Sequence, residues 1–130
     1  MISMHPNKRK HRILVVEDES ILRRLLVTTL RGEGYEVWES DNGYEGHKQA
    51  VKHHPDLVLL DIIMPSMNGI EMLRQLRQDT WGKTAKVVLL TNLDDVDNMN
   101  QGMRYGVTDY FIKSDWSLDE LAREVRAKLA

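Results

Sequence analysis

Three short runs of consecutive aliphatic residues, each followed by a polar residue, constrain the fold of this chain more than any other feature of its sequence. The runs cover residues 13–16, 58–60 and 87–90. Uninterrupted aliphatic runs of this length are typical of strands that are buried on both faces, as in a parallel sheet. Weaker runs at 35–38 and 110–112 predict two further strands, nearer to the edges of the same sheet.

Segments with the apolar spacing of helices separate these runs. The predicted helices cover residues 21–30, 44–53, 70–76, 94–104 and 118–129. Ser117 and Glu120 have the spacing of a capping box, which marks the start of the last helix. Gly32 and Pro55 are residue types that commonly end helices. Five strands that alternate with five helices indicate an α/β fold with a doubly wound parallel sheet.

Length and composition restrict the class of protein further. A chain of 130 residues fits one domain, and the absence of cysteine excludes disulfides, thiolate metal sites and cysteine nucleophiles. No apolar run approaches the ~20 residues of a membrane span, no signal peptide precedes the first strand, and a net charge of −2 gives no general attraction to nucleic acid. We therefore expect a cytoplasmic protein with no membrane attachment and no direct nucleic-acid binding. Residues 1–11 are expected to form an N-terminal tail, and we expect no fused output domain after the last helix.

Reactive side chains follow four of the predicted strands. Glu17 and Asp18 follow the first strand, Asp61 the third, Thr91 the fourth and Lys113 the fifth. The carboxyl ends of parallel strands meet at one edge of the sheet, where ligands bind in open α/β folds. Any one of these residues alone is more often a turn residue or a surface ion-pair partner, but the set at the ends of successive strands favours a shared site.

The charges of this predicted site indicate a cation and a phosphate. Three carboxylates ~5 Å apart at an effective dielectric constant of ~20 repel one another by roughly 3 kcal/mol per pair, or ~10 kcal/mol in total. Oxygen ligands alone favour Mg²⁺, Mn²⁺ or Ca²⁺ over zinc. The ammonium of Lys113 and the hydroxyl of Thr91 suit a phosphoryl group. Together these groups predict phosphoryl transfer with Asp61 as the nucleophile.

These motifs resemble those of the receiver domain of two-component response regulators, and the resemblance covers about residues 12–129. It rests on Glu17-Asp18-Glu19, Asp61-Ile62-Ile63-Met64-Pro65 with Gly69, Thr91, and Tyr110-Phe111-Ile112-Lys113. The resemblance implies that residues 12–130 form a stand-alone, CheY-like receiver domain with a flavodoxin-like fold. It also implies the strand order 2-1-3-4-5 and a signalling surface made of helix 4, strand 5 and helix 5.

The resemblance also implies a role for each acidic residue of the site. Asp61 would accept a phosphoryl group from the phosphohistidine of a histidine kinase or a histidine phosphotransferase, in a relay that ends at an unknown protein target. Glu17, Asp18, Asp61 and the backbone carbonyl of Ile63 would hold Mg²⁺, with Mn²⁺ as an alternative. We expect no enzymatic activity beyond Mg²⁺-dependent phosphorylation and dephosphorylation of Asp61.

Lys113 would contact the phosphoryl group, and Thr91 and Tyr110 would form a switch in which the hydroxyl moves towards the phosphate and the ring turns inward.

Two positions depart from the family pattern. Ser114 replaces the usual proline after a cis peptide, so the Lys113–Ser114 bond is either strained and cis or relaxed and trans. Asn92 replaces a small residue, and we hypothesise that it slows phosphoryl transfer or hydrolysis by crowding the attacking water.

Two other functions are compatible with parts of this pattern. A Mg²⁺-dependent phosphohydrolase would also use an aspartyl nucleophile, but such enzymes usually carry an acid/base aspartate two residues later, where this chain has Ile63. A degenerate receiver would bind partners without phosphorylation. The intact acidic pair together with Asp61, Thr91 and Lys113 argues against this second alternative.

Overall fold

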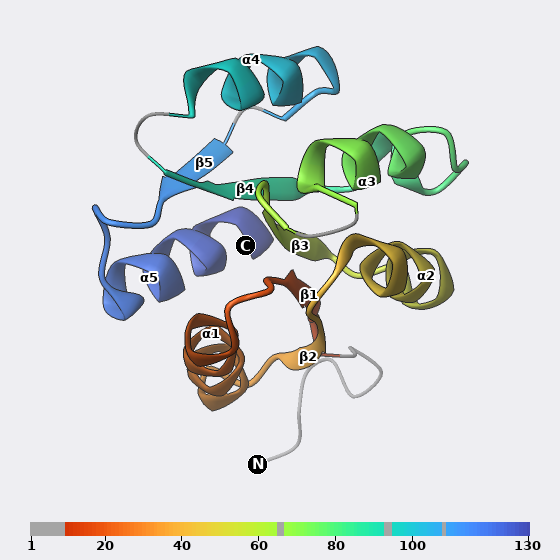
Figure 1. Ribbon diagram of the computed structural model, residues 1–130. Helices are drawn as coiled ribbons and strands as arrows, with labels where there is room; N and C mark the ends of the chain where they lie inside the picture. The colour runs from red at the N-terminus through yellow and green to blue at the C-terminus, as the bar shows by residue number, and fades with distance from the viewer. Residues whose placement is uncertain (1–9, 65–66, 93–94, 108) are drawn as a thin grey trace.

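The computed structural model describes residues 10–64, 67–92, 95–107 and 109–130. It shows one sheet with helices on both of its faces (Figure 1). The strands are β1 Arg12–Val16, β2 Glu36–Ser40, β3 Leu57–Asp61, β4 Val87–Thr91 and β5 Asp109–Ile112. All neighbouring strands are parallel, and their order is β2-β1-β3-β4-β5. The predicted fold class and strand order are therefore confirmed, whereas most of the predicted tail, residues 1–9, lies outside the described residues.

In the described ranges, four α-helices and one short 3-10 helix connect the strands, and a fifth α-helix follows β5. They are α1 Ser20–Gly32, α2 Gly43–His53, α3 Gly69–Leu76, η1 Gly82–Thr84, α4 Val96–Arg104 and α5 Leu118–Leu129. Ser117 caps α5 as predicted, since its side chain accepts a hydrogen bond from the N–H of Glu120. None of the helices in the described ranges combines the length and the hydrophobicity that a bilayer span requires.

The core consists of two apolar layers, one on each face of the sheet. Ile13 and Val15 belong to the layer beneath α1 and α5, whereas Leu14 and Val16 belong to the layer beneath α2 and α3. Because helices cover both faces, all four side chains of residues 13–16 in β1 are buried, and no polar position alternates with the apolar ones. This explains the uninterrupted aliphatic runs of the sequence and leaves the ends of the strands as the places for polar residues.

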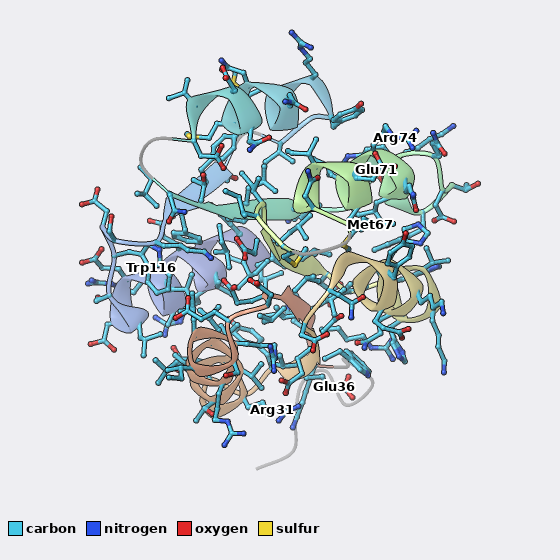
Figure 2. All side chains as sticks on the ribbon, viewed as in Figure 1. Arg31, Glu36, Met67, Glu71, Arg74 and Trp116 are labelled. Carbon is cyan, nitrogen blue, oxygen red and sulfur yellow. The ribbon has the colours of Figure 1, made fainter. Side chains whose placement is uncertain are left out.

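Close backbone contacts hold the start of α3 against the end of β3 at Asp61. Met67 lies between α2 and α3 (Figure 2), and a Cβ at Gly43 in α2 would lie 2.8 Å from the carbonyl oxygen of Met67. The N–H of Gly69 donates to the carbonyl of Ile62 at 2.7 Å. A Cβ at Gly69 would collide with the carbonyl oxygen of Asp61. Only glycine therefore allows α3 to begin so close to the end of β3.

Gly102 allows α4 to pack closely on the sheet, and its replacement is expected to destabilise the protein. A Cβ at Gly102 would lie 2.6 Å from Cδ1 of Leu89 and 3.2 Å from the hydroxyl of Tyr110. We expect Gly102→Ala to lower the free energy of unfolding by about 1–2 kcal/mol, because α4 must shift away from β4. The matched control is Gly32→Ala at the end of α1, where nothing lies within 4 Å of the new Cβ. It is expected to stabilise by about 0.5–1 kcal/mol.

Urea denaturation of both alanine variants measures these two effects. Opposite signs are expected for Gly102→Ala and Gly32→Ala. A gain of stability in both variants would contradict the close contact between α4 and β4.

Candidate functional site

Three carboxylates meet at the carboxyl edge of the sheet, where β1 and β3 end side by side. Glu17 and Asp18 follow β1, and Asp61 is the last residue of β3. Each offers an oxygen atom, and these atoms all lie within 4.8 Å of one another. Glu17 has an exposed fraction of 0% and Asp61 of 2%, whereas Asp18 is exposed. The structure thus brings together the three acidic residues that the sequence indicated.

Lys113 places an ammonium group between two of these carboxylates. Its Nζ lies 2.8 Å from Oε1 of Glu17 and 3.0 Å from Oδ1 of Asp61. The backbone N–H of Lys113 donates to the carbonyl of Thr91 at 2.8 Å, which holds the end of β5 against β4. The peptide bond to Ser114, which the sequence left open, is trans. With all three carboxylates ionised, three negative charges and one positive charge give a net charge of −2, which a divalent cation balances.

Burial and neighbouring charges shift the pKa values of Asp61 and Lys113. Burial, together with the hydrogen bond and charge of Glu17, raises the pKa of Asp61 from 3.8 to about 8, although Lys113 acts in the opposite direction. Burial alone would lower the pKa of Lys113, but its pairing with Glu17 and Asp61 outweighs burial and raises this pKa. Without a cation, the folded protein therefore favours a protonated Asp61 beside a charged Lys113.

One oxygen of Asp61 faces no hydrogen-bond donor among the residues that the structure describes. Oδ1 accepts a hydrogen bond from the N–H of Ile63 at 3.4 Å and faces Lys113, whereas Oδ2 is buried without a hydrogen bond from any described residue. A buried carboxylate oxygen without a partner is costly, so this atom fits a site that a cation or a substrate completes. The donor set consists of oxygen atoms only, which fits Mg²⁺ and Mn²⁺. The predicted use of the Ile63 carbonyl as a ligand stays a prediction.

Backbone contacts hold Glu17 in place, and sequence reasoning missed them. The N–H of Glu19 donates to Oε2 of Glu17 at 3.0 Å, and the N–H of Glu17 donates to the carbonyl of Ser40 in β2 at 3.0 Å. The carbonyl of Glu17 accepts a hydrogen bond from Nη1 of Arg23 at 2.9 Å. The available signal for Arg23 was its place one helical turn after Glu19. Apolar periodicity does not show which charged residue of a helix turns back towards the site.

The two predicted switch residues lie on neighbouring strands and have different partners. Thr91 is buried at the end of β4, and its hydroxyl donates to the carbonyl of Asn92 at 3.2 Å. The hydroxyl of Tyr110 in β5 donates to the carbonyl of Met99 in α4 at 2.6 Å and lies 3.3 Å from that of Val107. Burial raises the pKa of Tyr110. These contacts tie Tyr110 to α4, and a coupled movement of Thr91 and Tyr110 stays a prediction, as does the effect of Asn92.

Sequence comparison identifies relatives along almost the whole chain. Residues 13–126 match the response regulator receiver domain family. The response regulator ArlR of Staphylococcus aureus is 36% identical over 117 residues, which cover 90% of this chain and 52% of that protein. The chain therefore spans about half the length of this curated relative.

Solved structures share the fold. The chemotaxis response regulator CheY4 of Vibrio cholerae superposes with a TM-score of 0.84 at 25% identity, over 92% of this chain and 99% of that chain. The receiver domain of the sensor histidine kinase PA1611 of Pseudomonas aeruginosa has a TM-score of 0.81 at 24% identity, over 92% and 97% of the two chains. Its crystal structure holds a magnesium ion in the active site cleft. The fold that positions the acidic cluster is thus also found in chains of low sequence identity.

Proposed function

Because this chain belongs to the response regulator receiver domain family, we propose that Asp61 accepts a phosphoryl group from a phosphohistidine donor. Phosphoacceptor signalling in two-component systems is the general function of this family. The observation that carries the assignment to Asp61 is its buried Oδ2 atom, which has no partner among the described residues although Oδ1 faces the ammonium of Lys113. Asp61 therefore has a buried oxygen available for a new bond.

In the proposed reaction, Oδ2 of Asp61 forms a bond to phosphorus while the phosphorus–nitrogen bond of the donor breaks. The electron pair of that bond returns to the imidazole nitrogen of the donor. Lys113 lies 3.0 Å from Oδ1 and offsets the negative charge that enters the site with the phosphoryl group. Because Asp61 is only 2% exposed, few water molecules compete with the donor at the carboxylate.

We propose that Glu17, Asp18 and Asp61, with the carbonyl of Ile63, hold Mg²⁺ or Mn²⁺. When bound, the cation supplies charge neutralisation and orientation for the phosphoryl oxygens. The net charge of −2 and the three oxygen donors within 4.8 Å support this assignment. The magnesium ion in the cleft of the PA1611 receiver domain supports the choice of metal.

The proposed partners are a histidine kinase or histidine phosphotransferase and a downstream protein target. Phosphorylation would act on the surface of α4, β5 and α5 through Thr91 and Tyr110, because the hydroxyl of Tyr110 is bonded to α4. In this proposal, chemistry at Asp61 is limited to gain and loss of the phosphoryl group, since Ile63 stands where such phosphohydrolases usually carry an acid/base aspartate. The cytoplasmic location, the N-terminal tail and the absence of nucleic-acid binding are predictions from the sequence.

Incubation with acetyl phosphate and Mg²⁺ tests the proposed function directly. We expect an intact mass increase of ~80 Da within minutes, which corresponds to one phosphoryl group. Chelation of the metal with EDTA should prevent the increase, and Mn²⁺ should restore it. A protein that gains no mass with either cation would contradict the proposal, and sustained hydrolysis of p-nitrophenyl phosphate would favour the phosphohydrolase instead.

A further inference from the structure

We propose that Arg23 is a positioning residue for the cation site, where its guanidinium fixes the peptide group between Glu17 and Asp18. The inference rests on the proposed function, because it concerns the same divalent cation. Nη1 of Arg23 donates to the carbonyl oxygen of Glu17 at 2.9 Å, and Nε donates to Oε1 of Glu39 at 3.1 Å. Arg23 therefore connects the turn after β1 to a side chain of β2.

The turn between β1 and α1 gives Arg23 its access to the site. Residues 17–19 separate the two elements, so the chain reverses direction within three residues. Glu19 precedes α1 as its N-cap, but its side chain makes no capping hydrogen bond. The N–H of Arg23 donates to the carbonyl of Glu19 at 2.9 Å, and its side chain, which is 19% exposed, folds back to Glu17. Arg23 thus stabilises the turn that a capping side chain would otherwise hold.

Asp18 is the carboxylate that depends on this contact. The oxygens of Glu17 face the N–H of Glu19 and the ammonium of Lys113, so other groups hold this side chain directly. The carboxylate of Asp18 is exposed and makes no ion pair or hydrogen bond with any residue in the described ranges. The direction of the Asp18 carboxylate therefore depends on the backbone of the turn. Arg23 fixes that backbone at the carbonyl of Glu17, one bond away from the N–H of Asp18.

The charge of Arg23 and its contact with Glu17 have opposite effects on the affinity of the site for a cation. A guanidinium close to the site repels Mg²⁺, and Glu39 reduces this repulsion because it pairs with Arg23 at 3.1 Å. If charge alone mattered, the removal of Arg23 would tighten Mg²⁺ binding. If the position of the turn matters, its removal weakens binding, because groups that orient metal ligands typically contribute about 10–100-fold to affinity. The sign of the change therefore separates the two roles.

Arg23→Ala in the full chain, titrated with Mg²⁺ by isothermal calorimetry, tests the inference. We expect the dissociation constant to rise about tenfold. The Mg²⁺ concentration that half-saturates phosphorylation by acetyl phosphate should rise by the same factor, while the rate at saturating Mg²⁺ stays within about twofold of wild type. The matched control is Arg24→Ala, since Arg24 is the next residue of α1 and its exposed side chain makes no ion pair or hydrogen bond with a described residue. Its Mg²⁺ affinity should be unchanged or slightly tighter.

Arg23→Lys keeps the charge and one donor group, and we expect its Mg²⁺ affinity to lie between those of wild type and Arg23→Ala. Urea denaturation in EDTA checks that each variant folds, and the lysine variant carries the test if the alanine variant does not. Unchanged or tighter Mg²⁺ binding in the folded Arg23 variants would overturn the inference. If wild type itself bound no Mg²⁺, the proposed function would be contradicted. If wild type and the Arg23 variants bound Mg²⁺ equally well, only the inference about Arg23 would be contradicted, so the two failures are distinguishable.

Discussion

Asp61→Asn protein is expected to gain no mass from acetyl phosphate and Mg²⁺, because the amide of asparagine is a far weaker nucleophile than a carboxylate. The rate of phosphoryl uptake should fall by at least about 1,000-fold, since the substitution removes the atom that forms the new bond. The change is close to isosteric, and the chain around residue 61 is held by the backbone of β3 and β4. Intact mass spectrometry over a time course measures the loss.

Asp119→Asn is the matched control for this substitution. Asp119 lies in the first turn of α5 and is exposed, so the same chemical change there leaves the acidic cluster intact. Its rate of phosphoryl uptake should equal that of wild type. A full mass gain in Asp61→Asn would place the acceptor at another residue and would refute the assignment.

Metal-free Asp61→Asn protein is expected to be more stable than wild type, by a margin that grows with pH. The folded protein holds a proton on Asp61 up to about pH 8, whereas an unfolded chain releases it near the ordinary pKa of 3.8. A carboxyl group whose pKa is raised by folding contributes stability that is complete below its unfolded pKa and is lost as the pH rises through its folded pKa. Asparagine has no such proton, so its contribution does not change with pH.

Urea denaturation in EDTA measures this margin. Between about pH 5 and pH 8, the free energy of unfolding of wild type should fall by about 3–4 kcal/mol relative to that of Asp61→Asn. Saturating Mg²⁺ should then stabilise wild type by about 2–3 kcal/mol and the variant by much less, since a ligand stabilises the state that binds it. A constant difference between the two proteins across this pH range would contradict the raised pKa that burial and Glu17 give to Asp61.

The parallel sheet was predictable from the sequence because strands that are buried on both faces contain uninterrupted runs of aliphatic residues. The runs at 13–16, 58–60 and 87–90 contain no polar position, and the structure places all of them in strands whose side chains are buried. Element ends were less predictable. The sequence predicted a strand at 110–112 and a helix at 94–104, whereas β5 begins at Asp109 and α4 begins at Val96. Such ends depend on local hydrogen bonds more than on apolar spacing.

The meeting of Glu17, Asp61 and Lys113 was also predictable, because parallel strands bring their carboxyl ends to one edge of the sheet. The contacts within that site were not predictable. Nothing in the sequence pattern showed that the ammonium of Lys113 lies between the two carboxylates, or that Oδ2 of Asp61 has no partner in the part of the chain that the structure describes. Side-chain directions and hydrogen-bond partners depend on packing between segments that are distant in the chain.

The amino-acid sequence alone shows which residues end the buried strands, and therefore which chemical groups share one edge of the sheet. Hydrophobic periodicity and chain order suffice for this, since both are local properties of the chain. The folded protein is needed to show how deeply Asp61 is buried, which raises its pKa, and how Arg23 reaches the carbonyl of Glu17. Burial and long-range contacts of this kind arise when β1, β2, β3 and β5 pack together, because the dielectric environment and the partners of a charged group belong to the assembled fold.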